Sequence, residues 1–99
     1  MNVKEKVKQY ENEMIEDIRS LVAIKSVYES PKAGRPFGDG PAEALKQGLA
    51  LGDRLGFTTK NLDNYAGYIE MGEGEELIGI LAHVDVVPEG DNWKHDPFK

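Results

Sequence analysis

The chain has 99 residues, a formal net charge of −6 and 39% hydrophobic residues, a composition typical of globular proteins. The acidic balance argues against a nucleic-acid partner, because such proteins need clustered Lys and Arg to contact phosphates. The absence of cysteine excludes disulfide bonds and thiolate metal sites. No apolar run is long enough for a membrane span or a signal peptide, so we expect a cytoplasmic protein without a membrane partner.

The first predicted element is one long amphipathic helix from Val3 to Lys25. Its apolar residues recur at steps of three and four, which places them on one face of a helix. Asn2 can cap the start of this helix, with Glu5 three residues later. Residues 26–40 are rich in Ser, Pro and Gly and therefore predict a loop.

A second helix is predicted to begin at Pro41, whose fixed φ suits a first helical position. Gly56 is a natural residue for its C-terminal end. The interior glycines Gly48 and Gly52 indicate either close packing against a neighbour or simply a weaker helix.

Three strands are predicted after the helices, over Phe57–Leu62, Tyr65–Met71 and Leu77–Ala82. The glycine-rich residues 72–76 form the turn before the third strand. We therefore expect an α/β class, with two helices followed by strands of a mixed sheet. The third strand is apolar on both faces and needs cover from both sides, which the few residues after it can hardly supply. We interpret the chain as a fragment of a larger domain.

The candidate site is the pair His83 and Asp85, directly after the third predicted strand. Side chains alternate along a strand, so both are expected on the same face. A carboxylate beside an imidazole fixes its tautomer and orients the other nitrogen toward a metal. Open α/β sheets also carry their sites at the carboxyl ends of strands. The spacing His-x-Asp is common by itself, so an ordinary surface pair remains the alternative.

A longer pattern around this pair resembles the zinc-binding signature of the co-catalytic metallopeptidases. That family includes dipeptidase V, carnosinase-like enzymes, acetylornithine deacetylase and succinyl-diaminopimelate desuccinylase. The matching residues are His83-Val84-Asp85-Val86-Val87-Pro88, Gly90, Trp93, Pro97 and Phe98. Further segments resemble the family's opening helix (Ile15–Val27) or, more specifically, dipeptidase V (Gly40–Leu45, Gly56-Phe57 and Asp63–Gly67).

The resemblance implies a zinc aminopeptidase-like (phosphorylase/hydrolase-like) catalytic domain. Residues 1–99 would be its N-terminal part, without the remainder of the catalytic domain or the lid domain. It further implies a dipeptidase that uses two zinc ions, with His83 as a metal ligand and Asp85 as the catalytic-site acid that orients it. The family's other ligands and its general base lie downstream, so the 99 residues alone are expected to be inactive.

Two other functions remain open at the level of sequence. One is an N-acyl amino-acid deacylase or desuccinylase of the same fold, whose substrate would be a small N-acyl amino acid rather than a dipeptide. The other is a non-catalytic protein that self-associates through the apolar residues Leu77–Ala82. We interpret His95 as an exposed loop residue, Trp93 and Phe98 as packing residues, and the acidic residues 73–76 as a solvated turn.

Overall fold

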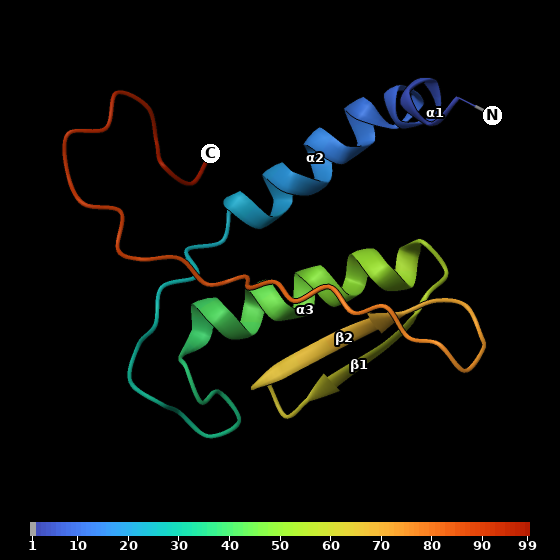
Figure 1. Cartoon of the computed structure of the whole chain (residues 1–99). Helices are drawn as coiled ribbons and strands as arrows, with labels where there is room; N and C mark the ends of the chain where they lie inside the picture. Colours follow the sequence, from blue (N-terminus) through green and yellow to red (C-terminus); the bar gives the residue numbers. More distant parts are fainter. Residues whose placement is uncertain (1) are drawn as a thin grey trace.

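The computed structural model describes residues 2–99 and contains three helices and a two-stranded antiparallel sheet (Figure 1). The predicted α/β class is confirmed, whereas the two strands form an antiparallel hairpin instead of part of a mixed sheet. None of the helices within residues 2–99 has both the length and the hydrophobicity needed to cross a membrane. The elements are α1 (Val3–Gln9), α2 (Glu11–Val22), α3 (Asp39–Arg54), β1 (Thr58–Leu62) and β2 (Ala66–Glu70).

The first predicted helix is divided in two at Tyr10. This residue has φ −101° and ψ 6°, and it ends α1 and precedes α2. Local charge explains the break, because lysines occupy the last turn of α1 and glutamates the first turn of α2. Each sign of charge stabilises the helix end at which it stands. The predicted cap is confirmed, since the Glu5 backbone N–H donates to Asn2 Oδ1 at 3.3 Å.

Helix α3 begins two residues earlier than predicted. Gly38 precedes it with φ 95°, a left-handed conformation that glycine adopts readily. Asp39 then occupies the first turn, where a carboxylate interacts favourably with the positive end of the helix dipole. Pro41 lies within that first turn, where its missing N–H costs no helical hydrogen bond.

The C-terminal half of α3 packs against the hairpin at Gly52. A Cβ atom at this position would lie 2.9 Å from Thr59 Cγ2 and 3.0 Å from Ile69 Cδ1. These separations are too short for ordinary contacts, so the close packing predicted for the helical glycines is confirmed at Gly52. It is not found at Gly48, where a Cβ atom would meet nothing within 4 Å.

The small core lies along the inner face of α3. Ala42 and Ala44 are buried, with 6% and 1% of their surface exposed. Gly67 of β2 approaches the same helix so closely that a Cβ atom there would lie 3.1 Å from Cδ1 of both Leu45 and Leu49. At Gly67, therefore, the backbone of β2 packs directly against leucine side chains of α3.

Polar contacts connect α2 to α3. Arg54 Nη2 lies 2.7 Å from Asp17 Oδ2 and 3.5 Å from Glu13 Oε1. Gln47 Nε2 donates to Ser20 Oγ at 3.0 Å. Much of the apolar face of α1 and α2 remains exposed, so these polar contacts are a main link between the two helices.

The prediction of a third strand at Leu77–Ala82 was wrong. No strand is formed there, and Leu77, Ile78, Ile80 and Leu81 are between 85% and 101% exposed. In Figure 1 this segment is the orange trace that follows β2. The physical reason is that a strand with two apolar faces needs cover on both sides, and residues 2–99 provide none.

The packing at Gly52 gives a first testable prediction. Ala is favoured over Gly inside a helix by about 1 kcal/mol, so Gly48→Ala should leave the free energy of unfolding unchanged or raise it. At Gly52 the added methyl group meets Thr59 and Ile69, and overpacking of this kind costs about 1–3 kcal/mol. We therefore expect Gly52→Ala to be the less stable of the two variants in urea unfolding followed by circular dichroism. Equal midpoints for both variants would contradict the packing.

Candidate functional site

His83 and Asp85 lie close together, as the sequence predicts. His83 Nδ1 is 3.4 Å from Asp85 Oδ1 and 3.0 Å from the main-chain carbonyl oxygen of Asp85. Their side chains are 82% and 64% exposed. The pair stands in an extended segment outside the sheet, so its expected place at the end of a buried strand was wrong.

The contact with the main chain favours one position for the proton of the neutral His83 ring. A carbonyl oxygen only accepts hydrogen bonds, so Nδ1 must be the donor when the imidazole is neutral. The carboxylate at 3.4 Å favours the same tautomer. The lone pair is then on Nε2, which is the atom that could bind a metal ion.

Both side chains line one groove, which we call the central groove. It has a volume of about 630 Å³ and lies between residues 80–85, α3 and β2. Val86 and Val87 instead line a second cavity of about 350 Å³ near the end of α2. Val84, between the two, lines both spaces, so groove lining alone does not distinguish the two sides of the segment. The predicted same-side arrangement of His83 and Asp85 is confirmed by the 3.4 Å between His83 Nδ1 and Asp85 Oδ1.

Three aromatic side chains form a wall of the central groove. Phe37 contacts Tyr65 edge to face, with ring centroids 5.6 Å apart and planes at 90°. Tyr28 lies 6.4 Å from Phe37, measured between centroids. Edge-to-face pairs of this kind are favourable beyond their buried area. The wall gives the groove an apolar surface near His83.

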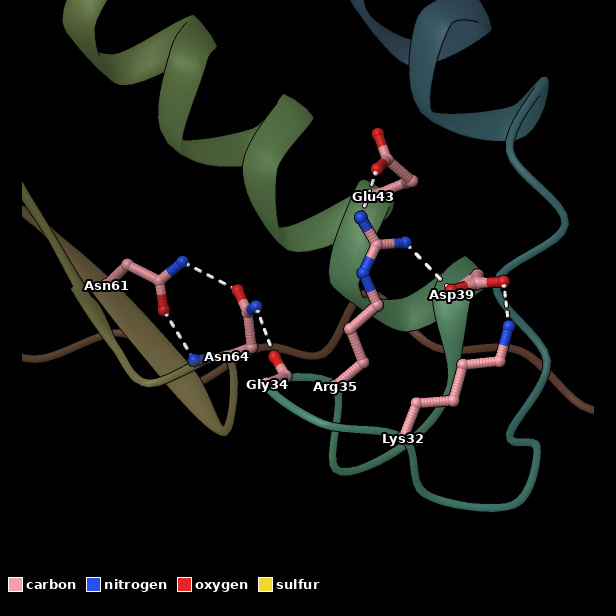
Figure 2. Close-up of polar contacts among 7 residues, drawn as sticks. All are labelled: Lys32, Gly34, Arg35, Asp39, Glu43, Asn61 and Asn64. Atoms are coloured by element: carbon pink, nitrogen blue, oxygen red, sulfur yellow. Dashed lines mark hydrogen bonds and ion pairs between the residues drawn. The ribbon is translucent and has the colours of Figure 1, made fainter.

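A network of charges holds the loop before α3, which carries two of these three aromatic side chains (Figure 2). Lys32 Nζ lies 2.7 Å from Asp39 Oδ2, and Arg35 Nη1 lies 2.8 Å from Asp39 Oδ1. Arg35 also reaches Glu43 Oε1 at 3.2 Å. The loop is thereby fixed to the first two turns of α3.

The same loop is bound to the hairpin turn by asparagines (Figure 2). Asp63 and Asn64 both have positive φ, 54° and 63°, as a type I′ turn requires. Asn61 Oδ1 accepts from the Asn64 backbone N–H at 2.8 Å, and Asn64 Nδ2 donates to the Gly34 carbonyl oxygen at 2.7 Å. The turn chemistry of the hairpin thus also orders the loop beside the groove.

The donor set fits one part of a metal site. A neutral imidazole with Nδ1 engaged and Nε2 open is the usual form of a histidine ligand. Within residues 2–99, however, no three His, Asp or Glu side chains gather around a common point. Zinc sites use about three or four protein ligands. The described residues can therefore contribute a ligand but do not complete a centre.

The remaining residues weighed in the sequence lie outside the pair. His95 is exposed, as expected. Trp93 is 58% exposed and fixes its loop mainly by a hydrogen bond, donating from Nε1 to the Glu89 carbonyl oxygen at 2.7 Å. Residues 73–76 are exposed, and Gly72 and Gly74 have the positive φ predicted for the turn. The contact between Lys25 and Glu89 was not predicted, because the two residues lie far apart in the chain and no local pattern connects them.

Comparison with known proteins found no matching family model. The chain is similar to curated proteins over nearly its whole length. It is 52% identical over 98 residues to a protein of Staphylococcus epidermidis named "Putative dipeptidase", a match that covers 97% of this chain and 21% of the relative. It is 48% identical over 100 residues to "Putative dipeptidase YtjP" of Bacillus subtilis, covering 99% of this chain and 22% of the relative.

A protein of Staphylococcus aureus (strain USA300), also named a "Putative dipeptidase", is 49% identical over 98 residues, covering 97% of this chain and 21% of the relative. The chain thus spans about a fifth of the length of the curated relatives that it matches. Identity near one half over 97–99% of the chain indicates that nearly all of it corresponds to a part of such proteins.

The charge network at Asp39 gives a pH-dependent prediction. Lys32 and then Arg35 hold the pKa of Asp39 below its ordinary value of 3.8. Because the pKa is lowered on folding, the network stabilises the protein above pH 3.8, and this contribution is lost as the pH falls through the folded-state pKa. We expect a carbon-13 NMR titration of the Asp39 carboxyl group to show this low midpoint, and Lys32→Met to raise it. Lys46→Met, which removes another exposed lysine, is the control; equal midpoints in both variants would contradict the network.

Proposed function

We propose that this chain is part of a zinc-dependent dipeptidase in which His83 binds the metal through Nε2 and Asp85 orients the imidazole. The observation that carries the proposal is the contact of His83 Nδ1 with Asp85, which leaves Nε2 as the open nitrogen. The names of the similar proteins support hydrolysis of dipeptides. The donor chemistry supports zinc, for which imidazole is a common ligand.

The residues of the chain would have separate tasks in such an enzyme. The negative charge of Asp85 would raise the basicity of the His83 imidazole and hold its orientation. The aromatic wall of the central groove, formed by Tyr28, Phe37 and Tyr65, would contact apolar parts of the substrate. Zinc in peptidases supplies Lewis-acid polarisation of the scissile carbonyl and activation of water. The further ligands and the general base would come from residues outside this chain.

We expect the full-length protein that contains this chain to hydrolyse dipeptides and to lose this activity on removal of zinc. His83→Ala should abolish turnover, because the ligand itself is lost. Asp85→Ala should reduce metal affinity or activity by about 10–100-fold, as is typical for the loss of a residue that orients a ligand. In the 99-residue chain both side chains are largely exposed, so neither change should lower the melting temperature of that chain much. Turnover, zinc content and thermal unfolding should be measured on one preparation.

His95→Ala is the matched control, because it removes the other, exposed histidine and should leave all three measurements unchanged. The 99-residue chain with the same zinc should be inactive, since catalytic zinc needs about three protein ligands. Normal specific activity in a zinc-replete Asp85→Ala protein would contradict the proposal that Asp85 orients the His83 imidazole. Activity of the 99-residue chain that disappears in its His83→Ala variant would overturn the need for further ligands.

A second function, self-association, is supported by the exposed apolar segment. Ile78, Ile80 and Leu81 are 92%, 93% and 101% exposed, in one continuous run. Contiguous exposed apolar surface and unpaired extended backbone both favour association with another chain. We infer that the 99-residue chain associates with itself through this segment when nothing else covers it.

Replacing Ile80 and Leu81 together by Lys should therefore shift the 99-residue chain toward the monomer in sedimentation velocity over a range of concentrations. The reason is that charges along an exposed strand edge oppose edge-to-edge pairing. The control is Val3→Lys, which introduces a charge at a similarly exposed apolar residue, 70% exposed, in α1. A chain that is monomeric at every concentration, or equal association of both variants, would exclude the segment as the interface.

A further inference from the structure

The peptide group that joins Asp85 to Val86 makes two hydrogen bonds in opposite directions. Its N–H, on Val86, donates to the Ser26 carbonyl oxygen at 2.9 Å. Its carbonyl, on Asp85, accepts from His83 Nδ1 at 3.0 Å. A trans peptide group is planar, with N–H and C=O pointing opposite ways. Fixing the N–H on Ser26 therefore aims the carbonyl at His83.

Residues 25–27, which we call the connector, contain Ser26, the acceptor of the Val86 N–H. Val27 forms a parallel β-bridge with Val86. Lys25 Nζ lies 3.1 Å from Glu89 Oε2, so an ion pair adds to the bridge three residues beyond Val86. The connector thus holds the segment that follows the His83–Asp85 pair by both main-chain and side-chain contacts.

The connector is in turn held by the first turn of α3. Ser26 is only 2% exposed, and Gly40 is packed against it. A Cβ atom at Gly40 would collide with the Lys25 carbonyl oxygen and would lie 3.1 Å from Ser26 Cα. Both are main-chain atoms, which cannot move aside as the end of a flexible side chain could. Only glycine at this position lets α3 approach the connector so closely.

We propose that Gly40 and Lys25 are positioning residues for His83. They act through the connector and the Asp85–Val86 peptide group, and they select the tautomer that carries its proton on Nδ1. The value of this tautomer for metal binding rests on the proposed function. The positioning itself requires neither metal nor substrate, so it is measured independently of peptidase activity.

The test is the tautomer of His83 in the 99-residue chain, read from imidazole nitrogen-15 shifts at about pH 9, well above the pKa of about 6.5 typical of imidazoles. His95 is exposed and serves as the reference imidazole in the same spectrum. We expect His83 to favour the Nδ1–H form more strongly than His95. Gly40→Ala should lower the ratio of Nδ1–H to Nε2–H on the order of two- to tenfold, the size expected for one net hydrogen bond. Gly48→Ala, in the same helix with open space around the added methyl group, should leave the ratio unchanged.

The amide resonances of β1 and β2 report whether each variant is folded. A folded Gly40→Ala protein with the wild-type tautomer would overturn the proposal. If Gly40→Ala does not fold, replacement of Lys25 tests the proposal instead, because its side chain is 57% exposed and we expect the fold to tolerate the change. Lys25→Glu should shift His83 toward the Nε2–H form, and the reversed pair Lys25→Glu with Glu89→Lys should restore it. An unchanged tautomer in Lys25→Glu would overturn the proposal.

These outcomes separate the positioning from the enzymatic function. If the full-length protein neither binds zinc nor hydrolyses dipeptides, the proposed function fails while a shifted tautomer in Gly40→Ala still supports the positioning. If the enzyme is active but the tautomer ratio of His83 is unchanged in Gly40→Ala and Lys25→Glu, the positioning proposal fails and the proposed function stands.

Discussion

The close approach of α3 to two neighbouring stretches of chain is the constraint on which the rest of the structure depends. Near its start, Gly40 packs on the main chain of residues 25–26, and near its end, Gly52 packs on Thr59 and Ile69 of the hairpin. Both the hairpin and the segment after His83 are therefore placed relative to one helix. The surface ion pairs refine this arrangement, but exposed pairs contribute little free energy by themselves.

Within the part of the chain that the structure describes, the His83–Asp85 pair lies between a segment without tertiary contacts to cover it and a segment that is hydrogen-bonded to the rest of the chain. Before His83, the residues Leu77–Ala82 are extended, unpaired within residues 2–99 and highly exposed. After Asp85, Val86 is bridged to Val27 and hydrogen-bonded to Ser26. The geometry of the pair is consequently set from its C-terminal side. If another part of a protein covered Leu77–Ala82, it would hold the chain on the N-terminal side of the pair as well. The contacts between His83 and Asp85 do not depend on that cover, because they are already formed here.

Local patterns predicted most of the fold, whereas features that depend on partners were missed. The helices and the hairpin follow from periodicity and turn residues. The break at Tyr10 was missed because the apolar stripe continues across it while the charges around it favour two helix ends. Leu77–Ala82 has the composition of a buried strand, but a strand forms only with a neighbour to pair with. The proximity of His83 and Asp85 was predictable because residues two apart in an extended chain share a side.

Proximity and orientation of the candidate ligand thus have different origins. The spacing of His83 and Asp85 puts both side chains on one side of an extended segment, and here the carboxylate lies 3.4 Å from the imidazole. It does not determine where the Asp85 carbonyl points, because the following peptide group is free to rotate in an isolated segment. That direction comes from Ser26, which is distant in sequence and is held by Gly40. A short motif can therefore identify a candidate ligand, while the tertiary contacts of α3 favour one of its two nitrogens as the open one.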